Sequence, residues 1–521
     1  MLYGWQKTAF KKIRDKNAIV SAPTGAGKTK VAYLWAGIID DKEQIIYPGI
    51  LKCGKIIFTA PIKALSNERY LELKNMGLNV GLETGDFKKN LDADIICCTQ
   101  EIYTKKYAPV PGQKVIIDEF HYATTDPQRA RAYIDGIVAT SSASKILLMS
   151  ATFGRPKKTK NYIEKITAKE FELYHTNKRM TKQVFFKEPI TLDEIKNALV
   201  FVFSLKGTAG IAEELALLRD RISANKERRL NEIAELLTIK RIPAVVYKGV
   251  GIYTGSLLPK EKLFMEAAFR ERIIDVMVGT DALSLGVNLP AETVVFAQLA
   301  KYYDGPISKN EFLQMAGRAG RKGYFDTGYV TYYPSNYESF DYDTEELYEY
   351  LLAAPQEPMR IELDVSVPAL LKGRSIEEEA EYVAQYSYPP QQKQKVIDYI
   401  KEILFKIDTF AEERNLPGLK ETLADIYFVE YNLGTNLRLA ATFAKTEEKL
   451  EVEKLISIVF THEPIRNEFY GFLQLRKYIN SLPKEYRKKI ANRQNLERMI
   501  NETDPTVKGF EEILAKIKPA G

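Results

Sequence analysis

Residues Ser21 to Lys30 read Ser-Ala-Pro-Thr-Gly-Ala-Gly-Lys-Thr-Lys and directly follow the apolar run Ala18-Ile19-Val20. A short strand, a glycine-rich turn and an amphipathic helix form the arrangement that wraps backbone N–H groups around a phosphate at a helix N-terminus. Gly25 and Gly27 let the backbone approach an anion without a Cβ in the way. The stretch therefore predicts a nucleotide-binding α/β domain near the start of the chain.

Two side chains of this loop have predicted roles. We expect Lys28 to reach the β- and γ-phosphates of ATP and the Thr29 hydroxyl to bind Mg²⁺. The predicted nucleotide-binding residues of the loop are Thr24, Gly25, Ala26, Gly27, Lys28 and Thr29. Ala22 stands where the general pattern has its first glycine, so a glycine-rich turn without function remains the alternative for this segment alone.

The composition is that of a globular protein too long for one core. The chain has 521 residues, 45% of them hydrophobic and 28% charged, which predicts two to four domains. No apolar run could span a bilayer and the first residues lack the apolar core of a signal peptide, so we expect a cytoplasmic or nucleoid-associated protein. The cysteines at 53, 97 and 98 suit neither a disulfide framework nor a zinc site, and we expect buried thiols. With a net charge of only +6, any binding to a polyanion should be local.

Short apolar, β-branched runs alternate with longer amphipathic stretches from residue 18 to residue 334. This alternation is typical of parallel sheets with helices on both faces, and it occurs twice. The expected strands are 17–20, 55–59, 94–99, 115–118 and 145–150, and then 183–187, 198–204, 276–279, 293–297 and 328–333. We predict an ATP-binding domain at 1–155, a second α/β domain at 156–340, a connecting segment at 341–390 and an all-helical domain at 391–521.

A second motif lies downstream of the phosphate loop. The buried-strand run Lys114-Val115-Ile116-Ile117 ends in Asp118-Glu119-Phe120-His121, and open α/β sheets bind ligands at the carboxyl ends of their strands. We expect Asp118 to hold Mg²⁺ through water and Glu119 to orient and deprotonate the water that attacks the γ-phosphorus. An Asp-Glu pair at a strand end is often a helix cap, but together with the phosphate loop it favours nucleotide hydrolysis.

The Asp-Glu-x-His motif and the later Ser150-Ala151-Thr152 resemble the DExH helicases of the second superfamily. Further matching motifs are Val278-Gly279-Thr280-Asp281, Gly286-Val287-Asn288-Leu289-Pro290 and Gln314-Met315-Ala316-Gly317-Arg318-Ala319-Gly320-Arg321. The last two are similar to the superkiller-type branch, which includes RNA and DNA helicases. The resemblance covers residues 1 to 334 and implies two tandem RecA-like P-loop domains that share one ATP.

The resemblance also implies roles for single residues. Arg318 and Arg321 correspond to arginines that stabilise charge on the transferring phosphoryl group, and Gln314 to a residue that contacts the nucleotide or its water. Gln6 resembles the glutamine that reads the adenine edge, with a core or surface role as the alternative. The residues expected to couple hydrolysis to nucleic-acid binding are His121, Ser150 and Thr152.

Loops at strand ends are the predicted nucleic-acid interface, because small polar residues and backbone N–H groups can hold phosphates without reading sequence. The candidates are Pro61, Lys63, Ala64, Thr84, Gly85, Asp86, Thr99, Gln100, Gly255, Thr280 and Asn288. For each of them an ordinary turn or cap is the alternative. Tyr253 and Thr254 replace the paired histidines of the branch, so the contacts expected there change.

Two further regions are candidate nucleic-acid contacts. Asp304-Gly305, flanked by aromatics that include Tyr303, signals a turn where related helicases carry a duplex-splitting β-hairpin, and a plain connecting loop is the alternative. In the tail, residues 476–498 hold eight basic side chains, among them Lys488 and Lys489, against two acidic ones. We interpret this run as a candidate strand-binding helix, with a solvated helical face as the alternative.

These motifs together predict an ATP- and Mg²⁺-dependent helicase or translocase that moves on a single strand of DNA or RNA. The resemblance implies 3′ to 5′ travel. The alternative is a nucleic-acid-stimulated ATPase that acts as a clamp or remodelling subunit without separating strands. A nuclease is disfavoured because the tail has one histidine and no metal-ligand cluster. We expect a monomer, with the helical domain as the surface for any protein partner.

Overall fold

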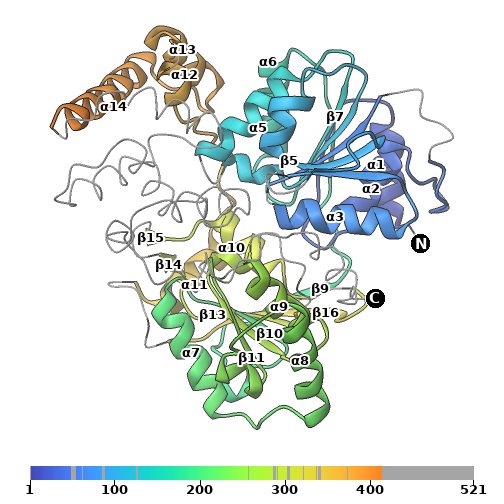
Figure 1. Ribbon diagram of the computed structural model, residues 1–521, viewed down its shortest axis with the longest axis vertical. Coiled ribbons are helices and arrows are strands. Elements are labelled where there is room, and N and C mark those ends of the chain that lie inside the picture. The colour runs from blue at the N-terminus through green and yellow to red at the C-terminus, as the bar shows by residue number, and fades with distance from the viewer. Residues whose placement is uncertain are drawn as a thin grey trace. The chain divides into compact units, whose positions relative to one another are not determined.

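The computed structural model describes residues 2–413 except 48–53, 62, 85–87, 125–126, 256, 258, 285–288, 290, 302–304, 321, 336, 338–341 and 372 (Figure 1). Within this part the chain divides into two compact units. The first comprises residues 2–20, 31–174 and 359–413, and the second residues 21–30 and 175–358. The predictions on residues 414–521, including the basic run with Lys488 and Lys489, lie outside the described residues.

The first sheet has eight strands. They are β1 (Ala18–Ser21), β2 (Ile56–Ala60), β3 (Val80–Glu83), β4 (Lys88–Lys89), β5 (Ile95–Thr99), β6 (Lys114–Ile117), β7 (Lys145–Ser150) and β8 (Glu172–His175), and their order in the sheet is β4-β3-β5-β2-β6-β7-β1-β8. The pairs β2·β5, β2·β6, β3·β5 and β6·β7 are parallel, and β3·β4 is antiparallel. The parallel α/β sheet predicted for this half of the chain is confirmed.

Helices cover both faces of this sheet. They are α1 (Gly4–Ile13), α2 (Lys28–Ala36), α3 (Lys63–Asn75), α4 (Gln100–Ile102), the π-helix η1 (Tyr103–Tyr107), the 3₁₀-helix η2 (Phe120–Thr124), α5 (Pro127–Ala139) and α6 (Pro156–Thr167). The strand order steps one way through α2 and α3 and the other way through α5 and α6. Right-handed crossovers therefore place these two helix pairs on opposite faces (Figure 1).

The sequence pattern missed some strands of the first sheet. In β3 the run Val-Gly-Leu-Glu is too short and glycine-containing to signal a strand. Gly81 is required there because a Cβ would lie 2.3 Å from the carbonyl oxygen of Asn90. At the far edge, the Glu172 N–H donates to the Asn17 carbonyl at 2.8 Å and adds β8 to the sheet. The first unit therefore continues to residue 174, beyond the predicted boundary at 155.

The second unit contains a six-stranded sheet in which every neighbouring pair is parallel. Its strands are β9 (Lys182–Phe185), β10 (Ala198–Phe201), β11 (Val250–Tyr253), β12 (Val276–Gly279), β13 (Thr293–Phe296) and β16 (Thr327–Tyr332), in the order β11-β12-β10-β13-β16-β9. Its helices are α7 (Leu205–Leu217), α8 (Ala224–Leu236), α9 (Pro259–Arg270), α10 (Lys309–Ala316) and α11 (Thr344–Ala353), with short 3₁₀ turns η3 (Leu192–Glu194), η4 (Ala244–Lys248) and η5 (Asp281–Leu283). The predicted second parallel sheet is likewise confirmed.

Alternation along β10 shows why this second sheet is buried on both faces. Leu199 and Phe201 pack into a core with residues of α8, α9 and α10, while Ala198 and Val200 pack into a separate core with α7. Successive side chains of a strand point to opposite faces, so an uninterrupted apolar strand needs helices on each side. Figure 1 shows α7 and α8 on opposite sides of the sheet.

The segment predicted as a connection, 341–390, is divided between the units. Helix α11 belongs to the second unit, whereas residues from 359 onward belong to the first, where they form α12 (Val367–Leu371), α13 (Ile376–Tyr386) and α14 (Lys393–Glu413). Ile361 and Tyr388 exchange two backbone hydrogen bonds of 2.7 and 2.8 Å, which bring the two ends of this segment together. None of the described helices combines the length and the apolar character that crossing a bilayer requires.

Candidate nucleotide and nucleic-acid sites

The phosphate loop has the backbone that its glycines predict. Gly25 and Gly27 have φ angles of +75° and +82°, and a Cβ at Gly25 would meet no atom within 4 Å. Lys28 starts α2 and is buried, and its ammonium donates to the carbonyls of Ala22 at 3.1 Å and Pro23 at 3.3 Å. Among the described residues no carboxylate pairs with this ammonium. An open loop at a helix N-terminus, with a buried cation held only by carbonyls, fits a phosphate group.

The acidic pair lies at the carboxyl end of β6. The Asp118 N–H donates to the Thr59 carbonyl at 3.3 Å, and the Asp118 Oδ1 accepts from the Glu119 N–H at 2.9 Å. Glu119 has a φ of +51°, a left-handed conformation that non-glycine residues seldom adopt. Such backbone strain concentrates at functional sites, where the surrounding structure holds it in place. The turn keeps both carboxylates at the edge of the sheet.

A cation that no sequence motif marks lies beside this pair. Arg69, on α3, has its Nη2 3.6 Å from Asp118 Oδ2, and its Nη1 donates to the Tyr33 hydroxyl at 2.9 Å and to Glu72 at 2.6 Å. Burial alone would lower the pKa of Arg69, but Tyr33, Glu72 and Asp118 together raise it well above its ordinary value. Arg69 therefore stays charged and lies within ion-pair distance of Asp118. A single arginine in a polar helix carries no signal of this contact.

The three residues predicted to couple hydrolysis to nucleic-acid binding lie together. His121 Nδ1 is 3.3 Å from Glu119 Oε2 and 3.2 Å from Ser150 Oγ, and the Ser150 Oγ also accepts from the Thr152 N–H at 3.1 Å. His121, Ser150 and Thr152 are all buried. The contacts form a continuous polar chain from the acidic motif to the turn after β7. The coupling role itself stays a prediction.

Gln6 is placed inside the first unit. It lies in the first turn of α1, is fully buried, and its Oε1 accepts from the Tyr3 N–H at 2.7 Å. This bond satisfies one of the N–H groups at the start of the helix. The contact gives Gln6 a role in the fold, and its reading of the adenine edge stays a prediction.

Several predicted nucleic-acid contacts of the first unit have little or no exposed side chain. Thr84, Thr99 and Gln100 are buried, and the Gln100 Oε1 accepts from the Thr59 hydroxyl at 2.7 Å. The Pro61 carbonyl accepts from Arg129 Nη1. These residues could reach a strand through backbone groups, while their side chains serve the fold. Lys63 and Ala64 begin α3 but their side chains lie outside the described part, as do Gly85 and Asp86.

In the second unit, the predicted arginine and glutamine lie at and just after α10. Gln314 and Arg318 are half-buried, and Arg318 Nη2 donates to the Ser284 carbonyl. The Thr280 hydroxyl accepts from the Ala282 N–H at 3.3 Å and caps η5, and at Gly255 a Cβ would meet nothing within 4 Å. The predictions on Arg321, Asn288 and Tyr303 lie outside the described residues.

Two features of the second unit clarify earlier expectations. Tyr253 is buried at the end of β11, and its hydroxyl donates to Glu266 at 2.8 Å, so it packs inside the domain. Burial, with the nearby Glu266 carboxylate, raises the pKa of Tyr253 well above its ordinary value. The predicted hairpin is present as β14 (Ala300–Lys301) paired antiparallel with β15 (Gly305–Pro306).

The prediction that the cysteines are buried thiols can be checked for two of the three. Cys97 and Cys98 are free and buried within β5, where burial raises the pKa of both thiols above the ordinary range. The expectation of buried thiols is confirmed for this pair. Cys53 lies outside the described residues.

The phosphate loop, the acidic pair at a strand end and the two successive parallel sheets are features of the P-loop class of proteins that hydrolyse ATP. Residues 3–159 match the model of the DEAD/DEAH box helicases, and residues 221–323 match that of the helicase conserved C-terminal domain. Together with the relatives described next, these matches are consistent with the DExH-box helicases of superfamily 2, in their superkiller-type branch.

Three relatives illustrate the branch. The ATP-dependent RNA helicase mtr4 of Schizosaccharomyces pombe is 29% identical over an alignment of 405 positions that covers 61% of this chain and 35% of that protein. The exosome RNA helicase MTR4 of Mus musculus is 26% identical over 63% of this chain and 38% of its own length. The ATP-dependent DNA helicase Hel308 of Thermoplasma volcanium is 27% identical over 80% of this chain and 65% of its own. The chain thus spans about a third to two thirds of the length of these relatives.

Proposed function

We propose that this protein is an ATP-dependent helicase that moves along a single strand of DNA or RNA and unwinds duplexes in the 3′ to 5′ direction. The observation that carries the proposal is the polar chain from Glu119 through His121 to Ser150. It joins the carboxylate suited to activate water to the turn of a second helicase motif. The names of the relatives, which are RNA helicases and a DNA helicase, support this class of activity.

Lys28 and the loop N–H groups would bind the phosphates of ATP. The Thr29 hydroxyl would bind Mg²⁺, and Asp118 would hold the ion through water. Mg²⁺, when bound, neutralises charge on the β- and γ-phosphate oxygens. Glu119, held in its strained turn by the neighbouring N–H contacts, would orient the attacking water and accept its proton. Gln314 and Arg318 would stabilise the charge that develops on the transferred group.

Movement would follow from alternating grip on the strand. When Glu119 takes part in hydrolysis its charge and contacts change, and His121 would pass that change to Ser150 and the turn that contains Thr152. A buried polar chain of this kind responds as a unit because each member orients the next. The hairpin of β14 and β15 is the proposed wedge at the duplex junction.

The test is the steady-state ATPase rate at fixed salt, measured alone, with single-stranded DNA and with single-stranded RNA. Glu119→Gln should abolish turnover, and the exposed Glu235→Gln on α8 is the matched control that should not. Stimulation by one polymer would identify the substrate. Partial duplexes with a 3′ or a 5′ overhang would then test the direction of travel.

An ATPase that is stimulated by a strand and leaves every duplex intact would contradict unwinding and support the clamp or remodelling function. Glu119→Gln that retains parental turnover would contradict the assigned chemistry altogether. Removal of the hairpin tip with unwinding unchanged at equal ATPase would contradict the wedge alone.

A further inference from the structure

A groove of about 240 Å³ lies in the first unit, between α6 and the chain that leaves α13. Its lining includes Lys158, Asn161, Tyr162 and Lys165 from α6, and Gln385 and Tyr388 from the other side. None of these residues belongs to a helicase motif of the sequence. The groove exists because residues 359–391 fold back onto the first unit.

Four polar side chains at the rim of the groove are available to a ligand. Within the part of the chain that the structure describes, Lys158, Asn161, Lys165 and Gln385 make no side-chain hydrogen bond or ion pair, and all four are exposed. Lys160, on another side of the same helix, instead pairs with Glu164 at 3.4 Å. The rim therefore presents two positive charges and two amides to an external ligand.

The polar groups at the floor of the groove, in contrast, form hydrogen bonds within the protein. The Tyr162 hydroxyl donates to the Tyr386 carbonyl at 2.5 Å, and the Ser387 Oγ accepts from the Leu363 N–H at 3.2 Å. The rings of Tyr162 and Tyr388 lie 5.2 Å apart at an angle of 53°. These contacts fix the aromatic surface, while the half-buried ring of Tyr388 remains accessible.

We infer that this groove binds a single strand of nucleic acid, with phosphates at Lys158 and Lys165 and a base against Tyr388. Lysines seven residues apart on a helix are about 10 Å apart along its axis, so a strand can contact both while a base lies between them. A positive groove with an aromatic surface is the combination that binds single strands without sequence preference. The inference rests on the proposed function only in the choice of ligand.

An acidic peptide could also meet the two ammonium groups. It would not use the ring of Tyr388 or the two amides in the same way, because stacking and amide contacts suit a base better than a carboxylate. Charge complementarity together with the accessible ring therefore favours the nucleic-acid strand. The peptide is treated as an outcome of the test.

The test uses the full chain with the double variant Lys158→Gln, Lys165→Gln. Its control, Lys157→Gln with Lys160→Gln, removes the same charge from the same helix outside the groove. Fluorescence anisotropy with labelled oligothymidylate and oligouridylate would be recorded over a salt series. Loss of two phosphate contacts should weaken binding and reduce the magnitude of the slope of log K against log salt by about 1.4, while the control keeps the parental slope.

The ATPase rate without nucleic acid should be unchanged in both double variants, since neither touches the phosphate loop or the acidic pair. Parental affinity and slope in the groove variant would overturn the inference. It would also be overturned if polyglutamate bound the parent protein and lost affinity for the groove variant while oligonucleotide binding stayed the same. Failure of Glu119→Gln to abolish ATPase would instead refute the proposed function and leave the binding result standing.

Discussion

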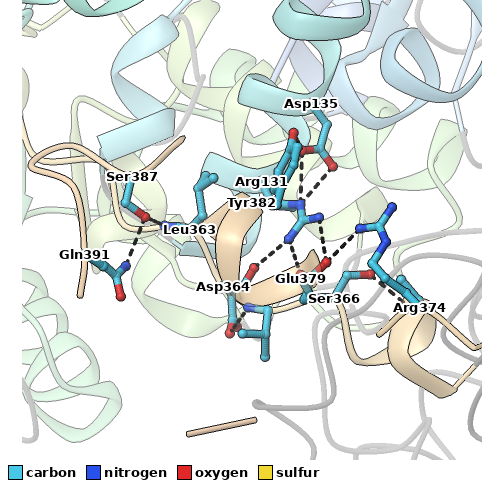
Figure 2. A network of polar contacts seen from close by, with 12 residues as sticks. Arg131, Asp135, Leu363, Asp364, Ser366, Arg374, Glu379, Tyr382, Ser387 and Gln391 are labelled. Carbon is cyan, nitrogen blue, oxygen red and sulfur yellow. Dashed lines mark hydrogen bonds and ion pairs between the residues drawn. The ribbon is translucent and has the colours of Figure 1, made fainter. Parts of the chain in front are cut away.

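The carboxylate of Glu379 fixes the returning segment to the first unit, and its removal is the most informative perturbation of the fold. Figure 2 shows Glu379 of α13 between Arg131 of α5 and Arg374. Glu379 is fully buried and accepts from Arg131 at 2.6 Å, Arg374 at 2.7 Å and the Ser366 N–H at 2.6 Å. Glu379→Ala would leave the largely buried Arg131 guanidinium and the Ser366 N–H without this acceptor, whereas the exposed Arg374 can turn to water.

The expected loss of unfolding free energy depends on the contacts that Arg131 keeps in the Glu379→Ala protein. Removing one partner of a buried ion pair costs about 3–5 kcal/mol. Arg131 Nε still donates to both carboxylate oxygens of Asp135 at 2.9 and 3.0 Å, and its guanidinium lies 4.4 Å from the ring centroid of Tyr382, so the lower end, about 3 kcal/mol, applies. For a domain of this size, that loss lowers the melting temperature by about 6–12 °C.

Thermal unfolding of the full chain, followed by calorimetry, measures this shift. The exposed Glu377→Ala on the same helix is the control, and we expect it to stay within about 0.5 kcal/mol of the parent. Hydrogen exchange should show the loss of protection in α5 and α13. A Glu379→Ala protein that melts with the parent would refute the reasoning that this network fastens the segment.

The same network predicts a pH dependence. Burial alone would raise the pKa of Glu379, but Arg131, Ser366 and Arg374 hold it below its ordinary value. The stabilisation is therefore present above the ordinary glutamate pKa and is lost as the pH falls through the lowered folded-state value. The difference in melting temperature between parent and Glu379→Ala should shrink in acid, and a difference that grows in acid would contradict the assignment.

Three further predictions concern the first unit. Gly81→Ala should cost about 1–3 kcal/mol of unfolding free energy because its Cβ would overlap the Asn90 carbonyl, and a denaturant titration with an unchanged midpoint would contradict this. Cys97 and Cys98 should react with a thiol reagent only at the rate of local or global opening, since burial raises their pKa; fast labelling of the native protein would refute it. His121→Ala should lower the stimulation of ATPase by a single strand more than the basal rate, and an equal loss in both would contradict a coupling role.

Local sequence patterns predicted the features of this protein that depend only on residues close together in the chain. The backbone of the phosphate loop needs positive φ angles at Gly25 and Gly27. The acidic pair comes directly after the buried strand β6 and starts at Asp118. Both features can therefore be recognised in short stretches of sequence. Most strands of both sheets were legible because a buried parallel strand is apolar on both faces, whereas β3, β4, β8 and β11 were missed. The resemblance to the helicases rested on several such stretches in a fixed order.

Only the tertiary structure decided which distant residues meet. Arg69 lies beside Asp118, and Arg131 pairs with Glu379 across 248 positions, although neither arginine belongs to a motif. The strand β8 and the end of the first unit at residue 174 depend in the same way on a partner far along the chain.

The physical reason is the range of the interactions. Strand periodicity, glycine conformation and capping depend on residues a few positions apart, and the order of residues therefore determines them directly. A buried ion pair, a groove between a helix and a returning segment, or an edge strand is stabilised only after the chain has closed a long loop. Many chains with the same local signals could close that loop differently, so the tertiary structure alone placed these contacts.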